Sequence, residues 1–142
     1  MKTILTVGVY DMLHIGHILL FKHAKELGDK LIVAVQDDDV IKKYKPDTQM
    51  VYTTEERMYM VSAIRYVDEV VPQTDYADKL GAAKKYGIDV MFVGDDWKGT
   101  DKWNKIEADL KEVGAKVVYF PYTKGTSSTL INETLIRLRE GK

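Results

Sequence analysis

The sequence predicts an α/β fold: a single-domain, doubly wound (Rossmann-like), five-stranded parallel sheet with helices on both faces. Short β-branched runs alternate with longer stretches of helical period along the chain. The run at residues 31–35 is apolar at every position, which is typical of a parallel strand buried on both faces. The length of 142 residues, with 45% hydrophobic and 30% charged residues, suits one globular domain over residues 1–142.

The expected elements follow one another as strand and helix in turn. We expect strands at residues 3–9, 30–36, 68–71, 89–93 and 116–120. We expect helices at residues 15–27, 54–65, 76–86, 102–113 and 127–139. Because parallel strands are joined by right-handed crossovers, these helices cover both faces of the sheet.

Two helix ends carry local signals. The apolar stripe of the first helix ends at Leu27, and Gly28 follows where a C-terminal cap belongs. Thr53 and Glu56 have the spacing of a capping box at the start of the second helix. These signals predict where the first helix ends and where the second helix begins.

Composition excludes several classes of function. Lys plus Arg number 21 and Asp plus Glu 22, so the net charge of -1 gives no overall field that attracts nucleic acid or an anionic membrane. The absence of cysteine excludes disulfides, a thiol nucleophile and a cysteine zinc cluster. No secretory signal is recognisable, and no apolar run approaches the roughly 20 residues of a membrane span. We expect a cytoplasmic protein with neither nucleic acid nor membrane as a partner.

Ligand-binding residues are expected at one edge of the sheet. In doubly wound sheets, ligands bind at the carboxyl ends of the strands, near the point where the strand order reverses. The loops that matter most therefore follow Val9, Gln36, Val93 and Phe120.

The first of these loops leads into His14-Ile15-Gly16-His17 at the start of a helix. The unpaired N–H groups and the dipole of a helix N-terminus favour an anion there. His14 and His17 are spaced to share one helix face, and Gly16 lets a ligand approach the backbone. The pattern predicts two imidazoles that converge on one phosphate.

Two other interpretations compete with this one. The histidines can simply be polar residues that open an amphipathic helix. They can also be a zinc pair, although zinc takes three or four protein ligands and the chain offers no cysteine. His23 is rotated far from both on the helix, so we expect it to face solvent.

Other polar motifs follow later strands. The lysines of 42–46 either face solvent or fold over the same phosphate pocket. Gly94 permits close backbone approach, and Trp97 offers a flat face for a base unless it is a core tryptophan. Ser127-Ser128-Thr129 sets three hydroxyl groups at the last helix start, more than one N-cap requires.

The ordered set of motifs resembles the cytidylyltransferases of the HxGH nucleotidyltransferase superfamily, most closely the glycerol-3-phosphate cytidylyltransferase group, over nearly the whole chain. The motifs that carry the resemblance are 8–11 with His14-Ile15-Gly16-His17, Lys43 and Lys45, Arg57, Arg65-Tyr66-Val67-Asp68-Glu69-Val70, Gly94-Asp95-Asp96-Trp97 and Thr123-Lys124-Gly125-Thr126-Ser127-Ser128. Class I aminoacyl-tRNA synthetases share the literal His-Ile-Gly-His, but 142 near-neutral residues leave no room for their tRNA-binding domains.

The resemblance implies a role for each matching residue. It implies that the catalytic residues are His14, His17, Lys43, Lys45 and Ser127. It implies nucleotide binding by Gly8, Val9, Tyr10, Asp11, Gly16, Gly94, Asp95, Asp96, Trp97, Tyr122, Thr123, Ser127 and Ser128. It implies acceptor binding by Asp11, Lys45 and Arg57, and a homodimer through Arg65, Tyr66 and Asp68.

The implied reaction is transfer of CMP from CTP to a small phosphomonoester or phosphonate, such as glycerol 3-phosphate, with release of pyrophosphate. The product is a CDP-linked precursor for cell-surface polymer or lipid synthesis. Because the acceptor is already an anion, catalysis reduces to aligning two anions and neutralising developing charge. Mg²⁺ is expected to be held by the CTP phosphates, with no direct protein ligand.

One motif departs from the group, which usually reads Arg-Thr-Glu-Gly-Ile-Ser where this chain has Tyr122-Thr123-Lys124-Gly125-Thr126-Ser127. Tyr122 cannot supply the bidentate phosphate contact of an arginine. Either Lys124 supplies the charge or the acceptor differs from glycerol 3-phosphate. Two further functions stay open: an adenylyltransferase that uses ATP, and an inactive nucleotide-binding sensor.

Overall fold

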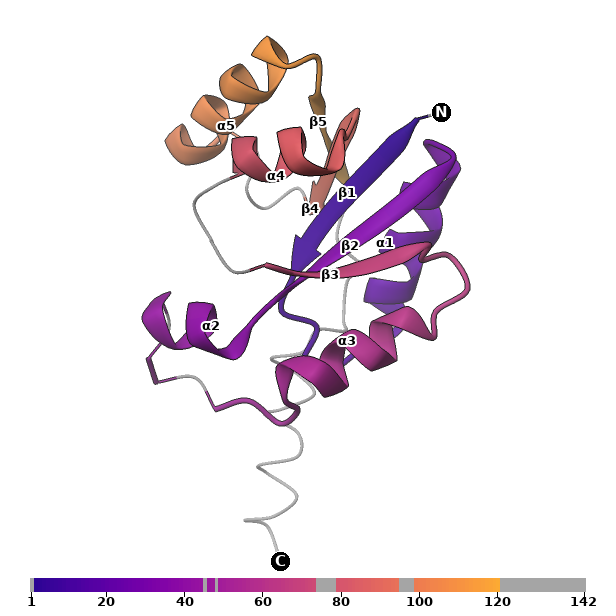
Figure 1. The fold of residues 1–142 in the computed structure, drawn as a ribbon, viewed down its shortest axis with the longest axis vertical. Helices are drawn as coiled ribbons and strands as arrows, with labels where there is room; N and C mark the ends of the chain where they lie inside the picture. Colours follow the sequence, from indigo (N-terminus) through magenta and orange to yellow (C-terminus); the bar gives the residue numbers. More distant parts are fainter. Residues whose placement is uncertain (1, 45, 48, 74–78, 95–98, 121–142) are drawn as a thin grey trace, which may run out of the picture.

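The computed structural model describes residues 2–44, 46–47, 49–73, 79–94 and 99–120 (Figure 1). In these ranges it contains one five-stranded sheet with the order β3-β2-β1-β4-β5, and all neighbouring strands are parallel. The strands are β1 (Thr3–Gly8), β2 (Lys30–Gln36), β3 (Glu69–Gln73), β4 (Val90–Gly94) and β5 (Lys116–Phe120). The expected doubly wound α/β fold is confirmed.

Helices cover both faces of this sheet. They are α1 (Ile15–Glu26), α2 (Asp38–Tyr44), α3 (Thr54–Ser62), α4 (Lys79–Tyr86) and α5 (Asp101–Glu112). Figure 1 shows α1 and α3 on one face and α4 and α5 on the other. The predicted capping box is present, because the Thr53 hydroxyl accepts from the Glu56 amide and the Glu56 carboxylate accepts from the Thr53 amide.

Alternate strand residues supply two separate cores. On β1, Ile4 belongs to a core that contains Phe21 of α1 and Val61 of α3. Its neighbour Leu5 belongs to a second core with Trp103 of α5. Because successive strand side chains point to opposite faces, the apolar strands can fill both cores at once. Full burial of each such side chain stabilises the fold by roughly 1.5–3 kcal/mol.

The residues after β2, expected to form a loop, instead form the short helix α2. The Asp37 carboxylate accepts a hydrogen bond from the Val40 amide at 2.8 Å and so caps the helix start. Val40 and Ile41 are the buried residues of this helix. One apolar pair in a helix of 7 residues leaves no periodic stripe in the sequence, which explains the wrong expectation.

Several boundaries also differ from those expected. β3 runs on to Gln73, so Pro72 lies inside a strand, which is tolerated because β3 is an edge strand. α3 ends at Ser62, and Ala63 is its C-cap, before the expected end at Arg65. Residues 76–78 of the fourth expected helix and the whole helix expected at 127–139 lie outside the described residues.

The strand order reverses between β1 and β4. From β1 the chain builds outward through β2 and β3, and it then returns to place β4 and β5 on the other side of β1. A ligand crevice is expected where the carboxyl ends of β1 and β4 diverge. The turn that follows β1 leads to His14 and His17, which places both histidines at this edge.

Candidate active site

The two histidines form a reciprocal cap at the start of α1. His14 is the N-cap residue, with extended backbone angles, and its Nδ1 accepts from the Gly16 amide at 3.0 Å. The His14 amide in turn donates to Nδ1 of His17 at 3.3 Å. The ring centroids lie 4.0 Å apart. The imidazoles thus lie side by side as predicted, although His14 precedes the helix and does not share a helix face with His17.

These two bonds decide the protonation of both rings. A backbone N–H can only donate, so each Nδ1 must carry a lone pair, and the proton of each neutral ring lies on Nε2. Burial is the main cause, and the neighbouring His14 the second, of a pKa of His17 that is lowered to about 4. Burial also lowers the pKa of His14. At neutral pH each ring of the pair is therefore uncharged and carries one Nε2–H donor.

We expect ¹⁵N NMR to find both imidazoles as Nε2–H tautomers at pH 7, with His17 still neutral near pH 5. The unfolded chain takes up a proton near pH 6.5, whereas folded His17 does so only near pH 4. The stability that neutral His17 contributes is therefore complete above about pH 6.5 and declines as the pH falls from there toward 4. Titration of the His17 ring with a midpoint at or above 6.5 in the free protein would contradict this account.

The Tyr10 side chain packs against the His17 ring. The Tyr10 φ of 54° lies in the left-handed region, which is a strained conformation for a bulky residue. Its ring is buried, meets the His17 ring edge-on at 5.4 Å and packs against Phe21 at 5.2 Å. The Tyr10 side chain thus supports the imidazole, and a nucleotide contact by Tyr10 stays a prediction.

Gly8→Ala is expected to displace this support. A Cβ at Gly8 would stand 2.6 Å from Cζ and 2.9 Å from the hydroxyl oxygen of Tyr10, so the ring must move. We expect a loss of about 1–3 kcal/mol in the free energy of unfolding and a fall in turnover of roughly tenfold or more as His17 shifts.

Gly114→Ala is the matched control, because Gly114 has a φ of 80° and a Cβ at this position would meet no atom of the described residues within 4 Å. It should lose stability through backbone strain and keep its turnover. Denaturant unfolding and initial-rate kinetics on both variants give the comparison. Equal turnover of the two variants would contradict a role for the Tyr10 ring beneath His17.

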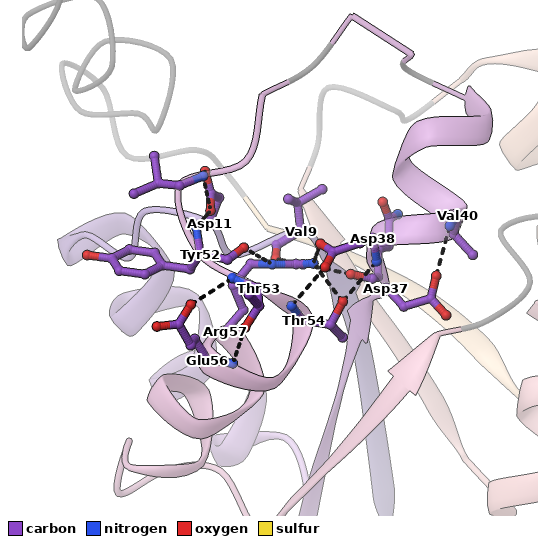
Figure 2. Close-up of polar contacts among 12 residues, drawn as sticks. Val9, Asp11, Asp37, Asp38, Val40, Tyr52, Thr53, Thr54, Glu56 and Arg57 are labelled. Atoms are coloured by element: carbon purple, nitrogen blue, oxygen red, sulfur yellow. Dashed lines mark hydrogen bonds and ion pairs between the residues drawn. The ribbon is translucent and has the colours of Figure 1, made fainter.

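Asp11, expected to bind the nucleotide or the acceptor, contacts main chain in the structure. Its Oδ1 accepts from the amides of Val51 at 3.1 Å and Tyr52 at 2.9 Å, and its Oδ2 accepts from Val51 at 3.0 Å (Figure 2). The carboxylate therefore ties the turn after β1 to the segment that precedes α3. A ligand contact by Asp11 stays a prediction.

Arg57, expected to bind the acceptor, is enclosed by the protein, and its side chain has no exposed surface. Five hydrogen bonds surround it in Figure 2, to the carbonyls of Val9, Gln36 and Tyr52, the Asp38 carboxylate and the Thr54 hydroxyl. A guanidinium has five N–H donors, so every donor is used. This corrects the expected role, because no surface and no donor of Arg57 remain for an acceptor phosphate.

The structure describes only some of the remaining predicted site residues. Lys43 is exposed on α2, just beyond the carboxyl end of β2. Gly94 ends β4 at the strand-order reversal, and Gly16 lies between the histidines. The other predicted site residues lie outside the described part of the chain: Lys45, Asp95, Asp96, Trp97, Tyr122, Thr123, Ser127 and Ser128.

The segment expected to form a dimer is largely accessible. Arg65 is exposed and Tyr66 is half-buried. The Asp68 carboxylate is engaged within its own chain, where it accepts from the Lys25 ammonium and from the Leu31 amide. Partial burial alone would raise the pKa of Asp68, and these hydrogen bonds outweigh it, holding the pKa below its usual value. Asp68 thereby fastens the start of β3 to β2 and α1.

His23 is exposed, as predicted. Its ring also packs against Phe120 at 4.8 Å. Among the described residues, no three His, Cys, Asp or Glu side chains gather as a metal-binding group. In the same part of the chain, no helix has the length and apolar character needed to cross a membrane.

Sequence reasoning missed three supporting groups. Asp38, the Tyr52 main chain and the Phe21 ring each contact an expected site residue. Asp38 and Tyr52 lie in segments whose pairing with Arg57 and Asp11 depends on how the sheet brings them together, so spacing carries no signal. The His14 and His17 pair did carry a signal, because residues three apart at a helix start lie close together, although the capping role of His14 appears only in the structure.

Comparison with known proteins identifies the family. Residues 5–138 match the cytidylyltransferase-like family model. The chain is 38% identical over 139 residues to the glycerol-3-phosphate cytidylyltransferase of Bacillus subtilis strain 168, covering 97% of this chain and 100% of that one. It is 38% identical over 136 residues to the enzyme of that name from Staphylococcus aureus, covering 95% and 96%.

A solved structure shares the fold. The lipopolysaccharide core biosynthesis protein from Thermoplasma volcanium superposes with a TM-score of 0.71 at 23% identity, covering 88% of this chain and 98% of that one. The family match extends through the sheet and the histidine turn to the segment after β5. The chain therefore belongs to the cytidylyltransferase-like family of nucleotidyltransferase enzymes.

Proposed function

We propose that the protein transfers CMP from CTP to glycerol 3-phosphate or a similar small phosphomonoester or phosphonate. A phosphate oxygen of the acceptor attacks the α-phosphorus of CTP. The bond from that phosphorus to the oxygen bridging the α- and β-phosphates breaks, and pyrophosphate leaves. The acceptor oxygen is already anionic, so the reaction needs no general base and no covalent enzyme intermediate.

The observation that carries this proposal is the pair of neutral Nε2–H donors after β1. Two uncharged donors in fixed positions can hydrogen-bond to the negative charge that develops on the phosphate oxygens and the leaving group. Because they are already in place, no reorganisation is needed at the moment of reaction. Their Nδ1 atoms are already bonded to backbone amides, so both rings are oriented before a ligand binds. An enzyme that catalyses phosphoryl transfer mainly by positioning its substrates requires such preorganised groups.

The proposed substrates are supported by the positive charge of the α2 lysines and by the names of two relatives. Lys42 and Lys43 are exposed residues of α2, which follows β2 at the same edge of the sheet, where a triphosphate favours positive charge. The Bacillus and Staphylococcus relatives are named for glycerol 3-phosphate and for cytidylyl transfer. Mg²⁺ held by the CTP phosphates would neutralise part of their negative charge.

The test is pyrophosphate release with Mg²⁺, offering CTP or ATP against a panel of phosphorylated acceptors. The panel contains glycerol 3-phosphate, ethanolamine phosphate, choline phosphate and a small phosphonate. We expect release with CTP and glycerol 3-phosphate. Turnover with ATP alone would replace the proposal by an adenylyltransferase, and CTP binding without release across the panel would favour the nucleotide-binding sensor.

We also propose a homodimer through the segment around Arg65 and Tyr66. Asp68 is engaged by Lys25 and Leu31, so Arg65 and Tyr66 are left as the expected contacts with the second copy. Sedimentation equilibrium at micromolar concentration should give twice the 16.2 kDa chain mass. Arg65→Glu should shift the distribution toward the monomer, and a wild-type protein of monomer mass would contradict the proposal.

A further inference from the structure

Arg57 joins four segments of the chain at the edge of the sheet. Its Nη1 donates to the Val9 carbonyl at 2.8 Å and to the Gln36 carbonyl at 2.6 Å, so it bridges the chain just beyond β1 and the last residue of β2. Its Nε donates to the Tyr52 carbonyl at 3.3 Å, in the segment before α3. Its Nη2 donates to Asp38 Oδ1 at 2.7 Å, in the first turn of α2. We call these contacts the Arg57 clasp.

Two further bonds close the clasp from its other side. The Asp38 amide donates to the Thr54 hydroxyl at 2.9 Å, and the Thr54 amide donates to Asp38 Oδ2 at 3.2 Å. Partial burial alone would raise the pKa of Asp38, but the hydrogen bonds from Arg57 and Thr54 hold that pKa below its usual value. The guanidinium charge is therefore countered inside the protein, and the start of α2 is held to the start of α3.

The clasp lies between the two groups of expected phosphate donors. From Val9 the chain runs through Asp11 to the His14 cap, and Asp11 is itself bonded to the amides of Val51 and Tyr52. From Asp38 the chain runs along α2 to Lys43. Figure 2 shows Arg57 at the centre of these contacts, with Val9 and Asp38 on its guanidinium. Arg57 is therefore hydrogen-bonded both to the chain that leads to the histidine turn and to the first turn of α2.

We propose that Arg57 is a positioning residue for nucleotidyl transfer, which sets the imidazole pair of the β1 turn relative to the lysines of α2. The inference rests on the proposed function only for the reaction that is positioned. Donors on two sides of a transferring phosphate must hold their places to within about 0.5 Å. A displacement of about 1 Å can cost on the order of a hundredfold in rate.

The test compares Arg57→Lys with Val61→Ala as a matched control. Lysine keeps the charge but has three donors in place of a planar fork of five, so the clasp loses several bonds. Val61 is fully buried on the same helix and lies in the α1 and α3 core, so its truncation weakens packing and leaves the five guanidinium contacts in place. Both variants are expected to melt at lower temperature than the wild type.

Steady-state kinetics then separate positioning from acceptor binding. We expect Arg57→Lys to lower kcat by roughly tenfold to a hundredfold, with little change in the KM for the acceptor. Val61→Ala should keep its kcat. If Arg57 instead binds the acceptor, Arg57→Lys will raise the KM for glycerol 3-phosphate by roughly tenfold or more while kcat stays close to the wild-type value. That result would overturn the proposal.

NMR of the free and liganded protein tests the clasp without turnover. Arg57→Lys should shift the Nε2 resonances of His14 and His17, whereas Val61→Ala should leave them in place. In the wild type, the Nε–H resonance of Arg57 should exchange slowly and keep its position on addition of glycerol 3-phosphate. Unmoved imidazole resonances in Arg57→Lys, or an Arg57 resonance that responds to the acceptor, would refute the clasp.

The two proposals fail in different ways. A wild-type protein that releases no pyrophosphate with any substrate refutes the proposed function, and the imidazole and guanidinium resonances then still decide the clasp. A wild-type protein that turns over normally, with Arg57→Lys equal to it in kcat, refutes the clasp and leaves the proposed function standing. If Arg57→Lys does not fold, the wild-type Arg57 resonance alone decides between positioning and acceptor binding.

Discussion

His14→Ala and His17→Ala are each expected to lower kcat by a hundredfold or more, equivalent to about 3–4 kcal/mol of transition-state stabilisation. Each substitution removes one Nε2–H donor from the pair whose rings lie 4.0 Å apart after β1. Each also removes an acceptor of the reciprocal cap, since Gly16 donates to His14 and His14 donates to His17. The loss of a cap costs about 1 kcal/mol in stability. Turnover near the wild-type value at saturating substrate would contradict the assignment.

Two further variants separate chemistry from capping. Asn is among the preferred N-cap residues, and Gln is a preferred residue at the third helical position of a capping box. His14→Asn and His17→Gln should therefore keep the start of α1 capped while they remove the imidazole. We expect both to approach wild-type stability in thermal unfolding and to remain as inactive as the alanine variants. Recovery of turnover together with stability would assign the histidines to the cap alone.

Arg57→Met is expected to produce the largest loss of stability among single substitutions at this edge of the sheet. It keeps an apolar stem but leaves the carbonyls of Val9, Gln36 and Tyr52 without their donor. With roughly 1 kcal/mol or more for each buried group left unpaired, the free energy of unfolding should fall by on the order of 3 kcal/mol.

Urea denaturation measures this loss, with Lys105→Met as the control. Lys105 is exposed in the middle of α5, so its substitution should change stability by less than about 0.5 kcal/mol. A loss below about 1 kcal/mol for Arg57→Met would show that the five guanidinium contacts are individually weak. The clasp would then be a consequence of packing and would hold nothing in place.

The fold was largely predictable because its signals are local. Alternating strands and helices, with apolar strands such as β2, define a parallel sheet without knowledge of any contact. The capping residues Thr53 and Glu56 located the start of α3 correctly. The helix α2 escaped because its two buried residues, Val40 and Ile41, are too few to show a period.

The site was predictable only where its residues are neighbours in sequence. His14 and His17 lie in one turn, so their pairing follows from spacing alone. The surroundings of Arg57 are different, because its partners come from positions 9 to 54 and meet only in the folded sheet. A motif shows that an arginine is present at a place, but its burial and the count of its used donors are tertiary properties. The same holds for Asp11, whose carboxylate contacts amides 40 and 41 residues away.

The most direct test of the central claim is ³¹P NMR of one reaction containing the protein, Mg²⁺, CTP and glycerol 3-phosphate. The claim is that a preorganised pair of neutral imidazoles at the end of β1 promotes attack of the acceptor on the α-phosphorus. It predicts equal amounts of a diphosphate diester and pyrophosphate with the wild type, and neither product at a comparable rate with His14→Asn. Pyrophosphate without the diester, or product formation at the same rate in His14→Asn, would contradict it.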